Sequence, residues 1–341
     1  MNLRYKLLFI IGNGFDLDLK LKTSYKSFVE SAEFEDHLDY WEVQRLRSDA
    51  FDFRHKSSIQ QQILFRHGRK SIFPILAAKT SLQNWIDIEQ QLALIAQNQK
   101  NTDEAIKKGA GLLELLPVEK DSFYELHSCL KNYLDGLPYD QISKGSYAYW
   151  LFSILNQYPE FVHVKSFNYT DWDKIFKNNN RIIPDHIHGR LKDNSLIIGI
   201  QDNIDIAPEY NYMIKTFSEN FHSHDLIPEL RSADEVIFFG HSFGETDYHY
   251  FEDFFKRQTN PDTARIGLPL SIFTLNRDTR MNILEQLRVM NNKRTDYLYA
   301  LSNLNIFMTD PNCNNGTEIG NFLRDLECRL EKEKSDYLKT S

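Results

Sequence analysis

The chain has 341 residues, 41% of them hydrophobic and 26% charged, a composition typical of a folded protein of about two domains. The 40 basic and 48 acidic residues give a net charge of −8 without a basic run, which argues against general nucleic-acid binding and against binding to anionic membranes. Three cysteines, with no Cys-x-x-Cys pair, exclude a disulfide framework and a zinc ribbon. The apolar run at residues 7–11 is too short to span a membrane, and we expect a cytoplasmic protein.

The first expected element is a buried strand at residues 6–11, which is apolar and runs into Gly12-Asn13-Gly14. Thr23 or Ser24 can cap the helix that follows. From about residue 25 to residue 160 the sequence has few glycines and places apolar residues at helical spacing, with a capping box expected at Ser122 and Glu125. This sequence pattern predicts a helical insertion.

Strand-like segments return after the insertion. They cover residues 162–167, 182–187, 196–200, 235–239, 270–275 and 304–308, and a charged amphipathic segment at 317–336 predicts a C-terminal helix. Strands separated by helix-length segments predict an α/β fold with a doubly wound, mostly parallel, Rossmann-like sheet. We expect residues 1–30 and 160–310 to form this core, 31–159 the helical insertion, and 311–341 the C-terminal helix.

Polar residues follow several of the predicted strands where the chain leaves the sheet. The segments are 12–16, 168–171, 186–189 and 240–244, with Asn276 and Arg277 as a fifth. In doubly wound sheets, ligands bind beyond the carboxyl ends of the strands. The sequence therefore predicts that these segments converge on one pocket.

The glycine segment has two interpretations. Gly12 and Gly14 allow close approach of the backbone, and the amides after them can bind a phosphate at the start of a helix. A dinucleotide-binding fingerprint has a third glycine where this chain has Leu17. A plain strand-to-helix turn is therefore the alternative.

The segment Gly240-His-Ser-Phe-Gly244 matches the Gly-x-Ser-x-Gly pattern of serine hydrolases. The histidine that follows Ser242 is His249, which we expect in the next helix, where it cannot serve as the base of a triad. Alternatively, Ser242 caps that helix and Glu245 completes a capping box. In a third interpretation the cap also contacts a ligand.

Histidines occur in two pairs, His186 with His188 and His222 with His224. The spacing suits zinc or iron ligation and equally suits ordinary hydrogen-bonded histidines. Because no carboxylate cluster accompanies either pair, we expect no metal.

Two further features carry alternatives. Asn168 can cap a turn, or it can hold sugar hydroxyls or an attacking water, because its amide both donates and accepts hydrogen bonds. Trp85, Asp87 and Glu89 lie on a predicted helix, where Trp85 and Glu89 share a face. They are either a core tryptophan beside a solvated acid or an acidic lining of the pocket mouth.

The order of these motifs resembles the AbiH family, whose members are associated with bacterial abortive infection against phage. The matching segments are Ile11-Gly-Asn-Gly-Phe-Asp16, Lys22-Thr-Ser-Tyr25, Trp85-x-Asp-x-Glu89, Ser166-Phe-Asn-Tyr-Thr170, Ile187-His-Gly189 and Gly240-His-Ser-Phe-Gly-Glu-Thr-Asp247. The family is similar in layout to sirtuin-like NAD-binding domains, including the NAD-hydrolysing ones used in phage defence. The resemblance implies a defence protein with NAD as its substrate.

The sirtuin comparison also implies roles for individual residues. Asn168 would contact the nicotinamide ribose and orient a water molecule, and His188 would be the catalytic histidine. The residues implied to bind the dinucleotide are Gly12, Asn13, Gly14, Phe15 and Asp16 at the pyrophosphate, Gly240 and Ser242 near the adenosine, and Asn276 at the adenine ribose.

Two departures from the sirtuin pattern affect these expectations. The chain lacks the four-cysteine zinc module of sirtuin deacetylases, which argues against deacetylation. Hydrolysing relatives have an acid two positions after the asparagine, where this chain has Thr170, with Asp171 one position further. The second departure favours a nucleotide-binding sensor that does not hydrolyse its ligand.

We expect a NAD glycohydrolase that breaks the bond between nicotinamide and ribose, with Asn168 holding the ribose hydroxyls and water and His188 accepting a proton. The alternatives are the nucleotide sensor, a metal-dependent nuclease and a serine hydrolase. Because a toxic activity must be restrained, we expect a blocked pocket or a homo-oligomer that rearranges after a phage or host protein trigger. We expect neither a nucleic acid nor a membrane as a partner.

Overall fold

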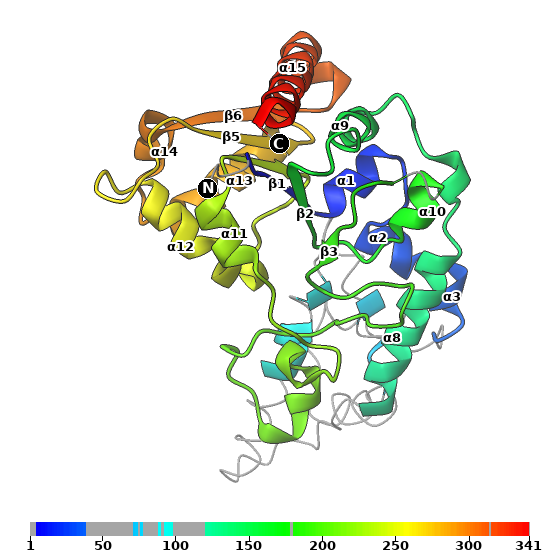
Figure 1. Cartoon of the computed structure of the whole chain (residues 1–341). Coiled ribbons are helices and arrows are strands. Elements are labelled where there is room, and N and C mark those ends of the chain that lie inside the picture. The colour runs from blue at the N-terminus through cyan, green and yellow to red at the C-terminus, as the bar shows by residue number, and fades with distance from the viewer. Residues whose placement is uncertain are drawn as a thin grey trace. The chain divides into compact units, whose positions relative to one another are not determined.

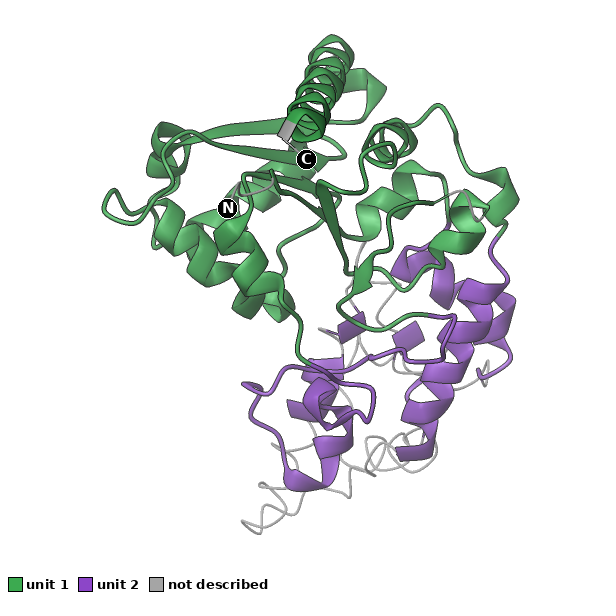
Figure 2. Cartoon of the chain, viewed as in Figure 1, with its two compact units in different colours: residues 1–21, 138–190, 223–341 green, residues 22–137, 191–222 purple. Residues whose placement is uncertain are grey.

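The structure is a computed structural model that describes residues 5–38, 71–73, 76–77, 88–89, 92–97, 120–177, 180–313 and 315–340. The chain divides into two compact units (Figure 2). Unit 1 comprises residues 1–21, 138–190 and 223–341, and unit 2 comprises residues 22–137 and 191–222. Residues 138–159, expected in the insertion, therefore group with unit 1, and residues 191–222, expected in the core, group with unit 2. Within the described ranges, no helix is long and apolar enough to span a bilayer.

The described part of unit 1 contains a six-stranded sheet with the order β3-β2-β1-β4-β5-β6, in which all neighbouring strands are parallel (Figure 1). The strands are β1 (Leu7–Ile11), β2 (Val162–Ser166), β3 (Asp185–His186), β4 (Glu235–Phe239), β5 (Leu268–Thr274) and β6 (Ser302–Met308). This is the order of a Rossmann-like sheet, and it confirms the predicted α/β fold.

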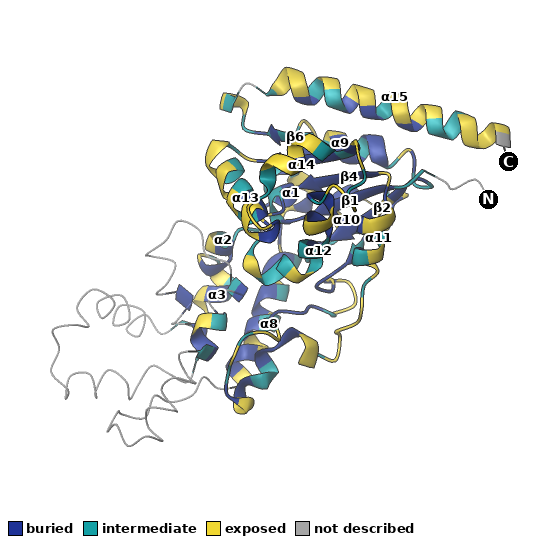
Figure 3. Cartoon of the chain, turned by 90° about the vertical axis from the view of Figure 1, so that its left-hand side faces the viewer, coloured by how far each residue is buried: buried dark blue, intermediate teal, exposed yellow. Residues whose placement is uncertain are grey.

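Helices cover both faces of the sheet. One face carries α11 (Leu226–Ser232), α12 (Tyr248–Gln258), α13 (Arg277–Met290) and α14 (Thr295–Leu301). The other face carries α1 (Asn13–Asp18), α9 (Tyr147–Leu155), α10 (Trp172–Phe176) and α15 (Gly316–Thr340). Short 3-10 turns are η1 (Tyr139–Gln141), η4 (Glu245–Asp247) and η5 (Pro311–Cys313). The central strands β1 and β4 are buried along their whole length, whereas the edge strand β6 is partly exposed (Figure 3).

The two faces of the sheet are packed with different side chains. Leu8 and Ile10 of β1 point to a mixed aliphatic and aromatic cluster that includes Phe251 of α12. On the opposite face Phe15 makes edge-on contacts with Phe9 and Phe239. The alternation of side-chain direction along a strand divides β1 between both layers, so a continuous apolar run there predicts a strand buried on both faces, as observed.

The C-terminal helix α15 is amphipathic. Ile319, Leu323, Leu326 and Leu330 are buried and recur at intervals of three and four residues, which places them on one side of the helix. The helix predicted at residues 317–336 is confirmed. Burial of this stripe stabilises the helix. The outer face of α15 is exposed (Figure 3).

Unit 2 is helical in its described part. Its elements are α2 (Tyr25–Val29), α3 (Ala32–Glu35), α8 (Lys120–Asp135), η2 (Pro208–Met213) and η3 (Lys215–Phe217). The hydroxyl group of Ser24 accepts the Ser27 N–H and caps α2, which confirms one of the two predicted caps. The rings of Phe28, Phe34 and Tyr133 pack together in its core.

Two predictions about local structure in unit 2 are wrong. Ser122 does not cap a helix, because it lies inside α8 and accepts the backbone N–H of Ile72. Residues 196–200 do not form a strand of the sheet, since the segment makes an isolated bridge between Ile200 and Ile214. An apolar run of five residues can be buried without a neighbouring strand, and its periodicity does not distinguish the two cases.

Candidate functional site

The carboxyl ends of five strands lie at one edge of the sheet in unit 1. Ile11 of β1 is in register with Ser166 of β2 and with Phe239 of β4. Ser166 is in register with His186 of β3, and Phe239 with Phe273 of β5. Because these strands are parallel, the segments that follow them leave the sheet at the same edge. Four of those segments are joined by direct contacts.

The loops after β1 and β4 touch through glycines. The Gly12 N–H donates to the carbonyl of Phe239 over 3.0 Å, and the Gly14 N–H donates to the carbonyl of Gly240 over 2.9 Å. A Cβ on Gly240 would lie 2.4 Å from the backbone of Gly14, and the φ of Gly240 is +65°. A side chain fits neither this spacing nor this backbone conformation. The glycines therefore allow two loops to pack at the point where the strand order reverses.

This packing affects the proposed phosphate loop. The Phe15 N–H donates to the carbonyl of Gly12 over 2.9 Å, in addition to the two bonds from Gly12 and Gly14. A pyrophosphate bound to these three amides would have to replace hydrogen bonds within the protein. Packing of the two loops accounts for the glycine spacing, which is close to the interpretation of the segment as a plain strand-to-helix turn. Pyrophosphate binding at this loop is still a prediction.

Asn168 ties the loops after β1, β2 and β3 together. Its Nδ2 donates to the carbonyl of Gly12 over 3.0 Å, and its backbone N–H donates to Ser166 Oγ over 3.2 Å. Its carbonyl oxygen accepts from Nδ1 of His186 over 3.0 Å. Asn168 is 6% exposed. The position of its amide is thus set by residues that are far apart in the chain.

Asp16 in α1 is a buried carboxyl group beside this asparagine. It is 1% exposed, and its Oδ2 accepts from Oγ1 of Thr170 over 2.9 Å. Its Oδ1 is buried and has no hydrogen-bond partner. Burial raises the pKa of Asp16 to about 7, and the neighbouring Thr170 hydroxyl and Asn168 amide offset only part of that effect.

His188 and His241 lie on either side of the Asp247 carboxylate. The Nε2 of His188 is 3.5 Å from Oδ1 of Asp247, and the Nε2 of His241 is 3.5 Å from Oδ2. The Nδ1 of His241 accepts the Phe243 N–H over 3.1 Å, so its proton is on Nε2, facing Asp247. The ring of Phe167 packs edge-on against both histidines. This group joins the loops after β3 and β4.

Sequence reasoning identified His188 but missed His241 and Asp247. Both lie in the segment Gly240 to Asp247, where the Gly-x-Ser-x-Gly pattern indicates Ser242 as a nucleophile. Their separation of six residues does not match the helical period, and the segment between them is not a strand. The turn between them, with a φ of +54° at Phe243, brings them together.

The structure does not give Ser242 the geometry of a nucleophile elbow or of a helix cap. Ser242 is exposed, and the positive φ values of the segment are at Gly240 and Phe243 rather than at the serine. The predicted cap is wrong, because α12 begins after Asp247 with no side chain capping it, and Glu245 lies in the intervening η4 turn. His249 lies in α12, as predicted.

Asn276 lies after β5 and caps the following helix. Its Oδ1 accepts the N–H of Thr279, and the Thr279 hydroxyl accepts the N–H of Asn276, which completes a capping box of α13. This cap explains the asparagine without a ligand. Contact with an adenine ribose is still a prediction for this residue.

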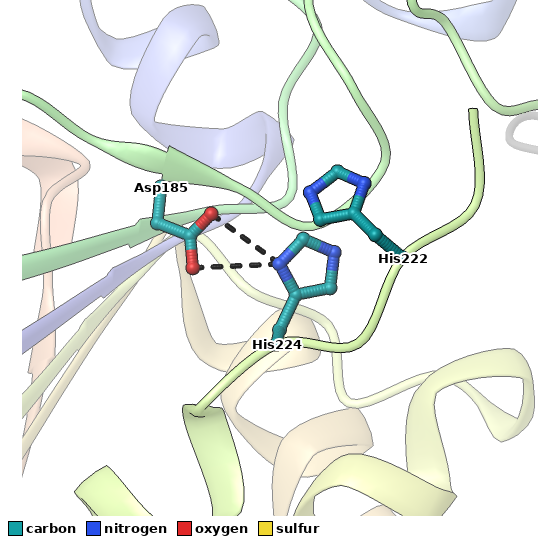
Figure 4. Close-up of side chains that lie close together, drawn as sticks. All are labelled: Asp185, His222 and His224. Atoms are coloured by element: carbon teal, nitrogen blue, oxygen red, sulfur yellow. Dashed lines mark hydrogen bonds and ion pairs between the residues drawn. The ribbon is translucent and has the colours of Figure 1, made fainter.

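The two histidine pairs predicted from the sequence, His186 with His188 and His222 with His224, have different partners. Nδ1 of His224 lies 3.3 Å from Oδ1 of Asp185, whose other oxygen accepts from Nζ of Lys165 over 2.8 Å. The hydrogen bonds and charges of His224 and Lys165 hold the pKa of Asp185 well below its usual range. Figure 4 shows Asp185 with His224, which belongs to the same unit. In the described part of the chain, neither His186 nor His188 belongs to a cluster of three potential metal ligands.

The acidic motif of the insertion lies partly outside the described residues. Trp85 and Asp87 are not among them. Glu89 is 6% exposed, and its Oε2 accepts from Nζ of Lys215 over 2.6 Å within unit 2. Glu89 is therefore a buried partner in an ion pair, and its predicted role as a solvated acid is wrong.

A family model described as "Bacteriophage abortive infection AbiH" matches residues 8–266. The match covers more than half of the chain and includes the loops after β1, β2, β3 and β4. No match to a curated protein is found.

Proposed function

Because the chain belongs to the bacteriophage abortive infection AbiH family, we propose that it acts against phage by hydrolysing NAD at the bond between nicotinamide and ribose. The observation that carries the proposal is the placement of Asn168, Asp16 and His188 at the carboxyl edge of a Rossmann-like sheet. All three side chains are more than nine-tenths buried. Buried polar groups at such an edge, one of them a carboxyl group whose pKa burial raises, are typical of catalytic sites.

The reaction requires stabilisation of a positively charged ribose. The bond to nicotinamide breaks through an oxocarbenium-like state, as in glycoside hydrolysis. Since the Nδ2 of Asn168 is held by the carbonyl of Gly12, its Oδ1 is pre-oriented to accept from a ribose hydroxyl or from water. Placement of this kind contributes several kcal/mol to lowering the barrier, on the order of the loss of one oxyanion-hole donor.

His188 acts as a proton acceptor at the ribose in this proposal. Its Nε2 faces Asp247, and a carboxylate beside an imidazole stabilises the imidazolium that forms when the ring takes a proton. His241 shares the same carboxylate from the opposite side. We propose Asp247 as the residue that orients both rings.

The rest of the dinucleotide would extend along the edge from β1 towards β5. The residues proposed to contact it are Gly12, Asn13, Gly14, Phe15, Gly240, Ser242 and Asn276. Because three amides of the β1 loop already donate within the protein, we expect side chains such as Asn13 and Ser242 to contribute more to phosphate binding than those amides.

Incubation of the purified chain with NAD tests the proposal. The expected result is release of nicotinamide and ADP-ribose in equal amounts, measured by liquid chromatography. A nucleoside monophosphate or free phosphate as product would instead indicate cleavage at the pyrophosphate. An unchanged NAD concentration would overturn the hydrolase proposal.

A nucleotide sensor is a second candidate, favoured by Thr170 at the position of the expected acid and by the burial of the candidate catalytic side chains. A sensor binds NAD without turning it over. Isothermal calorimetry on the same sample separates the two: heat of binding with intact NAD supports the sensor, and heat with product formation supports the hydrolase.

A further inference from the structure

Thr170 follows Asn168 by two positions, and the structure places a carboxyl group directly against it. The Oγ1 of Thr170 donates to Oδ2 of Asp16 over 2.9 Å. The two residues come from segments 154 positions apart in the chain. A carboxyl group beside Asn168 is thus supplied by Asp16 of α1, the helix that follows β1.

We propose that Asp16 is the proton acceptor for the attacking water and that Thr170 is its positioning residue. This inference rests on the proposed NAD hydrolysis and changes the role of Asp16 from phosphate-loop residue to catalytic residue. The carboxylate lies beside Asn168, which is proposed to hold the same water.

The surroundings of Asp16 are unfavourable for a purely structural carboxylate. The group is 1% exposed, one oxygen lacks a hydrogen bond, and no Lys, Arg or His side chain among the described residues forms an ion pair with it. A buried carboxylate usually has a cation or several hydrogen bonds to offset the loss of hydration. Such unsatisfied groups occur at functional sites, where they retain affinity for a proton.

Asp18, two residues further along α1, provides a contrast. Its Oδ2 accepts the N–H of Ala148 over 2.8 Å and joins α1 to α9. This carboxylate has a clear structural partner. The two acids on one helix therefore allow a matched comparison of a catalytic with a structural role.

The proposed step is balanced in atoms and charge. The C1′–N bond of NAD breaks, and its electron pair neutralises the pyridinium as nicotinamide leaves. The water oxygen forms a bond to C1′, and one proton of that water passes to the Asp16 carboxylate. Loss of this proton to solvent then regenerates the enzyme, with ADP-ribose as the second product.

Burial raises the pKa of Asp16 to about 7, close to the value at which a base is most effective near neutral pH. The groups that face the carboxyl group are Thr170 and Asn168, neither of which titrates. We therefore expect kcat to rise with pH through about 7 and to level off above it.

The test compares Asp16→Asn with Asp18→Asn in the full chain. Asp16→Asn should lower kcat by roughly 100-fold or more, the order expected for loss of a general base, with KM for NAD changed by less than about threefold. Added formate should restore part of the activity of Asp16→Ala. Asp18→Asn should retain kcat within about twofold of the parent chain.

Thr170→Val is a second variant, which keeps the shape of the side chain and removes its hydrogen bond. Because the Thr170 hydroxyl lowers the pKa of Asp16, its loss should move the rise of kcat to higher pH. A merely structural role for Thr170 would leave the profile in place. This variant also provides a readout if Asp16→Asn does not fold.

The outcomes separate the two proposals. If the parent chain hydrolyses NAD and both Asp16→Asn and Thr170→Val keep its kcat and pH profile, the role of Asp16 is overturned while the hydrolase stands. If the parent chain does not hydrolyse NAD, the proposed function fails and this inference fails with it.

Discussion

Two carboxylates of unit 1, Asp16 and Glu235, are equally buried but differ in the hydrogen bonds and charges that surround them. Each is 1% exposed. Glu235 begins β4 at the amino edge of the sheet, where it accepts from the Tyr5 hydroxyl over 2.5 Å and from the Arg329 guanidinium over 2.8 Å. Asp16 lies at the carboxyl edge, where Thr170 donates to one of its oxygens and the other has no hydrogen-bond partner.

The comparison distinguishes structure from function within one sheet. The carboxylate at the amino edge joins β4 to the N-terminal segment and to α15, and hydrogen bonds and a cation offset its desolvation. The carboxylate at the opposite edge lacks such compensation and keeps its affinity for a proton. We infer that the amino edge stabilises the fold and the carboxyl edge carries the chemistry. The predictions below can break or sharpen that division.

The largest expected effect is on NAD turnover. Asn168→Ala and His188→Ala should each lower kcat by roughly 100-fold or more, because one removes the amide at the ribose and the other a proton acceptor. Nicotinamide release measures the rate. As matched controls, Asn305→Ala and His163→Ala change exposed residues of the same types and should retain turnover. Equal activity in all four variants would contradict the assignment of chemistry to the carboxyl edge.

The next effect is on stability at the glycine contact. Gly240→Ala should lower the free energy of unfolding by about 3 kcal/mol, since it combines an unfavourable backbone conformation with a clash against the β1 loop. Gly267→Ala is the control: its φ is +77°, but a Cβ there meets no atom within 4 Å, so about 1 kcal/mol is expected. Urea denaturation measures both. Similar losses would show that the two loops separate easily.

A smaller effect compares the two buried acids directly. Glu235→Gln should destabilise the fold by about 2 kcal/mol, less than a fully buried ion pair would, because Arg329 is partly exposed to solvent. Asp16→Asn should leave stability at pH 8 unchanged or raise it, since it removes an uncompensated buried charge. A loss of stability in Asp16→Asn as large as in Glu235→Gln would make Asp16 a structural residue.

The smallest effect is the pH dependence that Asp16 adds to stability. Its pKa is about 7 in the fold against an ordinary value of 3.8, so the folded chain binds this proton more tightly than the unfolded chain does. The contribution of Asp16 therefore falls as pH rises from 4 to above 7, by about 1 kcal/mol between pH 6 and pH 7. The difference in unfolding free energy between the parent chain and Asp16→Asn isolates it. A pH-independent difference would place the pKa of Asp16 near its ordinary value.

The sequence predicted the parts of the fold that depend on local pattern. The apolar run before Gly12 and the run ending at Phe239 identify central strands because both faces of such strands are buried. Polar residues that follow predicted strands, such as Asn168 after β2, indicated the edge where a site can form. The run at 196–200 has the same local pattern, and only its lack of a neighbouring strand explains why it stays outside the sheet.

The parts of the site that the sequence did not predict depend on contacts between distant segments. Nothing in the spacing of Asp16 and Thr170 links them, and the hydrogen bond between them exists because β1 and β2 are adjacent in the sheet. Likewise, the role of Gly240 is its close contact with Gly14, a residue distant in the chain. The local sequence shows only its match to a serine motif. Ser242 matched the nucleophile-elbow motif, but in this chain a left-handed backbone conformation occurs at Phe243, the residue after the serine.

The most direct test of the central claim is the fate of NAD with the purified chain and with Asn168→Ala. The expected result is equimolar nicotinamide and ADP-ribose from the parent chain and a roughly 100-fold lower rate from the variant. Intact NAD with the parent chain, or the same rate from both proteins, would contradict a glycohydrolase site at the carboxyl edge of the sheet.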